Sequence, residues 1–128
     1  MEDLTLQEKL YDFYLYIYPH LNNYPKNEKF LLRARTEDCL LDIMDSVERA
    51  NKSHTKKGHA YEADIKLAKL RRLFRLAKDL KIISIHRYSV ISGHLIEIGN
   101  ILGGWIKWIQ KKEGAKTIPN DMQEQPDS

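Results

Sequence analysis

The chain has 128 residues, of which 42% are hydrophobic and 30% are charged, and its net charge at neutral pH is +3. This length suits one domain with a single core, and no apolar run reaches the ~20 residues that a transmembrane helix needs. The single cysteine excludes an internal disulfide and, because no signal-peptide pattern opens the sequence, favours a cytoplasmic protein.

Charge is distributed unevenly along the chain. Residues 66–112 contain eleven Lys or Arg and two acidic residues, whereas residues 1–65 contain nine basic and twelve acidic residues. A strongly basic half favours a polyanionic partner such as nucleic acid. The alternative interpretation is that these basic side chains only decorate solvated helix faces.

Apolar residues at helical spacing predict two helices in the first half of the chain. The first covers residues 6–21, and the second covers residues 28–51 and has an acidic outer face. The segment that follows, NKSHTKKGH over residues 51–59, has no aliphatic side chain and is the clearest predicted loop.

Two further helices are predicted in the second half. The third covers residues 60–81, and Ser84 is expected to cap a fourth over residues 85–112. Four amphipathic helices with short connections predict an all-α fold, an antiparallel up-down-up-down four-helix bundle of residues 1–112. Residues 113–128 have the composition of a disordered tail.

The third predicted helix carries a row of cations. Arg71, Arg75 and Lys78 follow i, i+4, i+7 spacing, and Arg72 lies beside them. Arginines on a rigid helix present hydrogen-bond donors to phosphates or carboxylates in a fixed geometry. A merely solvated face remains the other interpretation, and the uneven charge of the chain favours a partner-binding surface.

The fourth predicted helix carries two apolar rows. One seam of the bundle core needs only one such row, so the second row predicts an oligomer interface. The alternative is that both rows form one wide stripe that packs against two neighbouring helices. The first row, a heptad seam, is Tyr88, Ile91, Leu95, Ile98, Leu102, Trp105 and Ile109, and the second is Val90, His94, Ile101 and Trp108.

Three glycines interrupt the same helix at 99, 103 and 104. Each costs ~1 kcal/mol relative to alanine inside a helix, so we expect the close approach of a neighbouring backbone to compensate. Signals for catalysis are poor: the five histidines lack metal-ligand spacing, and Cys39 lies beside an apolar row and is expected to be a buried structural thiol. No enzyme, metal or cofactor is predicted.

Several segments resemble the Avd proteins, the accessory variability determinants of diversity-generating retroelements. The resemblance covers most of residues 6–112 and is most specific in the fourth helix, where residues 97–106 read EIGNILGGWI. The other matching segments are LYDF at 10–13, YPHL at 18–21, YPK at 24–26, LLDIM at 40–44 and LRRLFRLA at 70–77.

The resemblance implies a non-catalytic four-helix bundle that assembles into a pentameric barrel. It also implies binding to the retroelement's reverse transcriptase and to nucleic acid, RNA or DNA, in the complex that makes mutagenic complementary DNA. The partner-binding residues would then be the basic positions of the third and fourth helices, which are Arg71, Arg72, Arg75, Lys78, Lys107, Lys111 and Lys112.

A second family is similar in fold and pentameric assembly, the four-helix-bundle proteins encoded by intervening sequences in large ribosomal RNA genes. Those proteins usually carry an NIAEG run after their second helix, where this chain reads ERAN at residues 48–51. The Avd family is therefore preferred. The alternative function is a structural or protein-interaction bundle without a role in nucleic-acid binding.

Overall fold

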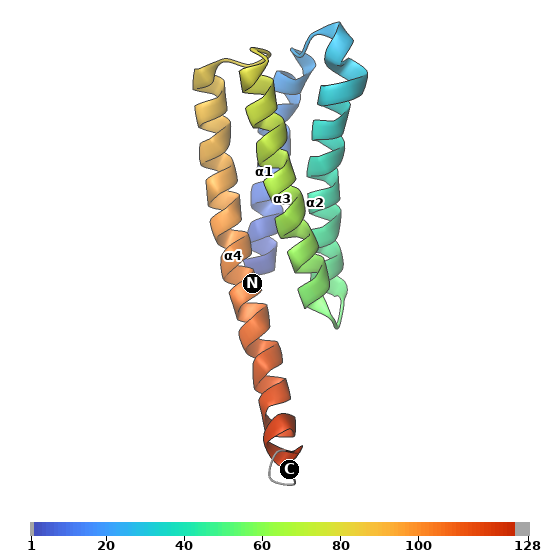
Figure 1. The fold of residues 1–128 in the computed structure, drawn as a ribbon, viewed down its shortest axis with the longest axis vertical. Coiled ribbons are helices and arrows are strands. Elements are labelled where there is room, and N and C mark those ends of the chain that lie inside the picture. Colours follow the sequence, from blue (N-terminus) through green and yellow to red (C-terminus); the bar gives the residue numbers. More distant parts are fainter. Residues whose placement is uncertain (1, 125–128) are drawn as a thin grey trace.

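The computed structural model describes the backbone of residues 2–124 and the side chains of residues 4–114. Successive helices run in opposite directions, and the described residues contain no strand (Figure 1). The predicted all-α, up-down-up-down four-helix bundle is confirmed. Its helices are α1 (Glu2–Asn22), α2 (Ala34–Lys52), α3 (Lys56–Asp79) and α4 (Ile85–Glu124).

Helices α1 and α3 occupy diagonal corners of the bundle, since each packs against both α2 and α4. The connections α1–α2 and α3–α4 lie together at one end of the molecule, and the α2–α3 loop lies toward the other end (Figure 1). We call the end that holds the α1–α2 and α3–α4 connections the crossover end; it is formed by residues 23–33 and 80–84. Because of this arrangement, two connections that are far apart in the sequence lie at the same end of the molecule.

The core is one apolar cluster that runs along the bundle axis. Phe13 of α1 meets Phe74 of α3 edge to face across the diagonal, with ring centroids 6.2 Å apart. Burial of a large apolar side chain contributes about 1.5–3 kcal/mol to folding. The seam predicted on α4 is confirmed, because Tyr88 is half-buried against the core and the six others, Ile91, Leu95, Ile98, Leu102, Trp105 and Ile109, are at most 2% exposed.

The second helix differs from its prediction at the start. A short 3-10 turn at Lys26–Glu28 and a π-helical turn at Lys29–Arg33 precede α2. The chain leaves this wide turn with Leu32 buried and Phe30 pointing into solvent, 82% exposed. Hydrophobic periodicity does not anticipate such a turn, because a π turn adds one residue to the helical repeat.

The loop predicted over residues 51–59 is wrong, since only residues 53–55 separate α2 from α3. The Lys56 ammonium donates hydrogen bonds to the carbonyls of Ala50 and Asn51, at 3.0 and 2.8 Å. The Ser53 hydroxyl accepts a hydrogen bond from the Thr55 N–H at 3.1 Å. These side chains satisfy backbone groups at the helix ends, and so a polar segment becomes mostly helical.

The α3–α4 connection is a tight turn. The predicted cap at Ser84 is confirmed, because its hydroxyl accepts a hydrogen bond from the Arg87 N–H at 3.0 Å. Lys81 adopts a left-handed conformation with φ 62°, and the Ile82 N–H bonds to the Ala77 carbonyl at 2.8 Å. This is a helix-ending motif in which glycine is more usual than lysine.

Helix α4 continues past its predicted end at Lys112 as far as Glu124. Its 40 residues span roughly 60 Å at ~1.5 Å per residue, and its last part projects beyond the other helices (Figure 1). The division into a bundle of residues 1–112 and a disordered tail of residues 113–128 stays a prediction. None of the described helices combines the length and apolar character that crossing a membrane requires.

Candidate partner-binding surface

The cations predicted on α3 lie on two sides of that helix. Arg71 lies on the side toward α4, where its Nη2 donates a hydrogen bond to the Leu95 carbonyl at 3.2 Å. It lines a hollow of about 190 Å³ between α3 and α4 together with Phe74, Tyr88, Ser92, Leu95 and Ile96. The guanidinium is therefore held in place by the backbone of α4.

Gly99 makes room for this guanidinium. A Cβ at position 99 would overlap the end of the Arg71 side chain, whereas a Cβ at Gly103 or Gly104 would meet no atom within 4 Å. Within one chain, the expected close approach of a neighbouring backbone is therefore not seen at any of the three glycines. At Gly99 the approaching group is a side chain from α3.

Arg75 and Lys78 continue the row of Arg71 along the α4 side. The Lys78 ammonium lies 4.7 Å from the centre of the Tyr88 ring and 3.4 Å from the Asp79 carboxylate. Arg75 also faces Asp79, at 3.9 Å, and its side chain stays 70% exposed. Exposed ion pairs of this kind are weak. Arg75 is therefore more accessible to an anionic partner than Lys78, which also contacts the Tyr88 ring.

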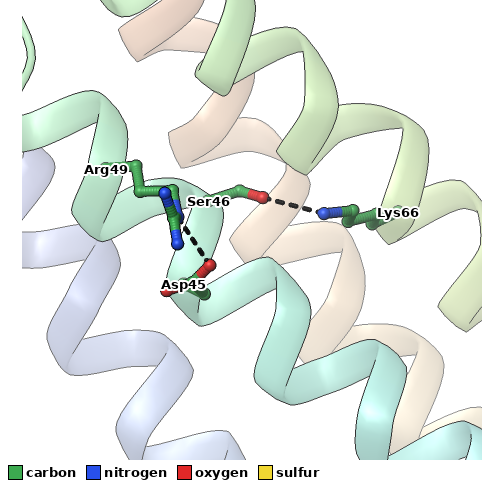
Figure 2. A network of polar contacts seen from close by, with 4 residues as sticks. All are labelled: Asp45, Ser46, Arg49 and Lys66. Carbon is green, nitrogen blue, oxygen red and sulfur yellow. Dashed lines mark hydrogen bonds and ion pairs between the residues drawn. The ribbon is translucent and has the colours of Figure 1, made fainter.

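Arg72 lies away from that row. Its charge, with those of Lys66 and Lys69, reaches Cys39 on α2. Lys66 donates a hydrogen bond across the helix pair to the Ser46 hydroxyl at 3.1 Å (Figure 2). Figure 2 also shows Arg49 paired with Asp45 on the outer face of α2, at 2.8 Å.

The lysines predicted on α4 form a second cationic group far from the first. Lys107, Lys111 and Lys112 are exposed, and Lys112 places its ammonium 4.8 Å from the centre of the Trp108 ring. Because α4 runs antiparallel to α3, this group lies near the start of α3, roughly 24 Å along the helix from Leu95. The structure therefore separates the two predicted groups along the length of the bundle.

The crossover end holds cations that sequence reasoning missed. Lys26, Lys29 and Arg33 come from the α1–α2 connection, Lys81 comes from the α3–α4 connection, and Arg87 lies in the first turn of α4. The two connections are more than 40 positions apart in sequence, and only the topology of the bundle shows that they lie at the same end of the molecule (Figure 1). Arg87 is anchored there by a hydrogen bond that it donates to the Tyr16 hydroxyl at 2.8 Å.

The second apolar row of α4 runs along α1. The His94 ring lies 4.7 Å from the Tyr16 ring and 5.9 Å from the Phe13 ring. Ile101 is half-buried against the core and Val90 is half-buried, while Trp108 is 44% exposed. Packing against two neighbouring helices thus accounts for part of this row, and an oligomer interface on it stays a prediction.

Among the described residues, the one cysteine is buried and no metal-binding cluster is found. Cys39 is buried, and its thiol donates a hydrogen bond to the Lys66 carbonyl at 3.2 Å. Burial raises the pKa of this thiol above its usual value, although nearby lysines oppose the shift. No group of three or more His, Cys, Asp or Glu among the described residues is arranged to hold a metal ion.

Comparison with protein families agrees with the resemblance seen in the sequence. The model of one family, described as bAvd-like, matches residues 4–109. This range includes α1, α2 and α3 almost entirely and the part of α4 that belongs to the core. No curated protein matches the chain. Because the match spans most of the sequence and all four helices, the chain belongs to the bAvd-like family.

Proposed function

We propose that this protein is a non-catalytic accessory factor of a diversity-generating retroelement. In this role it binds the reverse transcriptase and the template RNA or complementary DNA, in the cytoplasm and as a homo-oligomer, a pentamer by analogy with the family. Membership in the bAvd-like family supports the accessory role. The observation that carries the binding role is the excess of nine positive charges in residues 66–112.

The predicted binding residues differ in how their side chains are held. Arg75, Lys107 and Lys111 are exposed, and Arg75 has only its weak pair with Asp79 to compete with a phosphate. Lys78 and Lys112 lie beside aromatic rings. Arg71 is oriented by α4, and Arg72 adds charge on the outward side of α3. Contacts of this type release counterions, and binding that depends on them weakens steeply with salt.

The test is binding of labelled template RNA and of the cognate reverse transcriptase over a range of salt concentrations. We expect the variant Arg75→Glu/Lys107→Glu/Lys111→Glu to lose binding. Each phosphate contact removed should lower the salt slope by about 0.7 on single-stranded RNA. The matched control reverses two exposed cations on α2, Arg49→Glu/Lys52→Glu, and should bind as the wild type does.

Two outcomes would contradict the proposal. RNA and transcriptase binding by the triple variant equal to that of the wild type would show that Arg75, Lys107 and Lys111 do not carry the binding. Absence of any salt-dependent binding by the wild type would favour the alternative, a structural or protein-interaction bundle related to the ribosomal RNA intervening-sequence proteins.

The proposal also makes a prediction about gene context. A reverse transcriptase gene and a near-duplicated template repeat are expected beside the gene that encodes this protein.

A further inference from the structure

The hollow between α3 and α4 lies within the basic half of the chain. Its volume of about 190 Å³ is below the ~300–1,000 Å³ of pockets that hold drug-sized ligands. It therefore suits one flat ring, or one side chain of a partner. Apart from Arg71 and Ser92 its lining is apolar or aromatic, and consists of Phe74, Tyr88, Leu95 and Ile96.

The apolar lining of the hollow is only partly covered by the chain itself. Phe74 and Leu95 are each 1% exposed and close the inner side of the hollow. Tyr88 is half-buried, and Ile96 is 57% exposed. Both therefore keep surface that a bound ring can cover. A concave apolar lining with a few polar groups at its edge is the usual form of a ligand site.

Arg71 brings hydrogen-bond donors to this hollow in a fixed orientation. Its Nη2 donates to the Leu95 carbonyl at 3.2 Å, and Gly99 leaves space for the guanidinium. A guanidinium presents its N–H groups as two parallel pairs, and Nη2 contributes one N–H to each pair. The bond to Leu95 therefore leaves one pair complete. Among the described residues, no carboxylate forms an ion pair with Arg71.

Two further cations follow the hollow along α3. Arg75 is one turn beyond Arg71, and its side chain is 70% exposed. The Lys78 ammonium lies 4.7 Å from the centre of the Tyr88 ring. Proteins that bind single-stranded nucleic acid combine such cations, which meet phosphates, with apolar and aromatic surface on which bases lie. An acidic peptide would neutralise the cations and leave the apolar lining uncovered.

A parallel pair of N–H donors discriminates among the bases. Guanine presents the acceptors O6 and N7 side by side, and an arginine bidentate to that edge is the commonest specific base contact. Adenine carries an amino donor in place of O6, and uracil, like thymine, offers O4 alone on this edge. The complete donor pair of Arg71 therefore matches guanine.

We propose that the hollow receives one unpaired guanine of a bound single strand, with Arg71 donating to its O6 and N7. The ring lies against the apolar lining, and Arg75 and Lys78 meet neighbouring phosphates. This inference rests on the nucleic-acid binding within the proposed function, to which it adds a base preference. It gives Arg71 a role that positive charge alone does not fulfil.

The test compares uridine oligonucleotides of about ten residues, a usual site size for single-strand binders, that differ in one central base. Fluorescence anisotropy at one salt concentration measures their affinities. We expect the wild type to bind the guanine oligonucleotide about tenfold more tightly than the adenine one, as one bidentate contact provides. An oligonucleotide with 7-deazaguanine, which keeps O6 and lacks N7, should bind nearly as weakly as the adenine one.

Two variants separate the hollow from its charge. Arg71→Lys keeps the charge and loses the donor pair, so it should bind both oligonucleotides equally with an unchanged salt slope. The matched control, Arg49→Lys on the outer face of α2, should keep the tenfold preference. Ser92→Phe fills the hollow and should abolish the preference, whereas Gly93→Phe, where a Cβ would meet no atom within 4 Å, should keep it. Circular dichroism checks that all four variants are folded.

Equal binding of the guanine and adenine oligonucleotides by the wild type would overturn the inference. A preference that persists in Arg71→Lys or Ser92→Phe would do the same. If these variants lost the transcriptase and kept the base preference, the hollow would hold a protein side chain instead. RNA binding without a guanine preference refutes this inference alone, whereas absence of salt-dependent RNA binding refutes the proposed function as well. The two failures are therefore distinguishable.

Discussion

Arg71 and Gly99 form a coupled pair between α3 and α4. Alanine at position 99 would gain about 1 kcal/mol of helix propensity. It would also displace the guanidinium from the Leu95 carbonyl, and a hydrogen bond from a charged group contributes about 1.5–3 kcal/mol. The two effects oppose each other only while Arg71 is present.

We therefore expect Gly99→Ala to stabilise the Arg71→Ala background by about 1 kcal/mol and to give less stabilisation, or a net loss, in the wild type. Urea unfolding of the four proteins in this double-mutant cycle measures the difference. Gly104→Ala, at a position with open space around it, should give the same stabilisation in both backgrounds. Equal effects of Gly99→Ala in the two backgrounds would show that Arg71 does not depend on the glycine.

His20 is expected to make stability depend on pH. Burial, and then the charge of Arg87, lower the pKa of this imidazole below its ordinary value of 6.5. The Tyr16 ring lies 5.1 Å from it, and Arg87 and His94 of α4 also contact that tyrosine. Protonation is thus less favourable in the folded protein than in the unfolded chain.

The unfolded state takes up this proton first as the pH falls below about 6.5, so stability is lost on acidification. The free energy of unfolding should decline as the pH falls through and below about 6.5 in the wild type, and decline less in His20→Gln. Urea unfolding at each pH measures both, with the exposed His86→Gln as the control. Identical pH profiles for wild type and His20→Gln would contradict the assignment.

At the scale of an element, α4 divides into a part that the core needs and a part that projects. Trp105 and Ile109 are each 2% exposed, whereas residues after 114 extend beyond the other helices (Figure 1). A chain that ends after Gly114 should unfold at the same urea concentration as the full chain. A chain that ends after Gly104 should lose several kcal/mol, because two large buried side chains are gone.

Circular dichroism during urea unfolding compares the two shortened chains with the full chain. A loss of more than about 1 kcal/mol on ending the chain after Gly114 would exceed the usual effect of a change outside the core. That result would contradict a bundle confined to residues 1–112.

The elements differ in how far sequence reasoning predicts them. The α4 seam follows from steps of three and four alone, because a buried row must repeat with the helix. The loop at residues 51–59 was mispredicted because composition is a weak guide where side chains such as Lys56 satisfy the helix ends. The π turn at Lys29–Arg33 has no periodic signal at all.

At the scale of the whole molecule, the fold was predictable and the surface only in part. Charge segregation identified α3 and α4 as the basic half, but Arg71 and Arg72 proved to lie on different sides of α3. The cations at the crossover end could not be grouped without the topology, because Lys29 and Lys81 come from separate connections. Spacing within one helix gives neighbours on that helix, and contacts between helices depend on how the helices are rotated in the bundle.

The placement of both crossovers at one end has a practical consequence for handling the protein. The first turn of α1 and the projecting part of α4 both lie toward the opposite pole (Figure 1). A fluorophore or surface tether attached to the first turn of α1 or to the projecting part of α4 would therefore lie far from the connection that carries Phe30 and its neighbouring cations. If the protein is immobilised through such a tether, every molecule presents its crossover end to the solution.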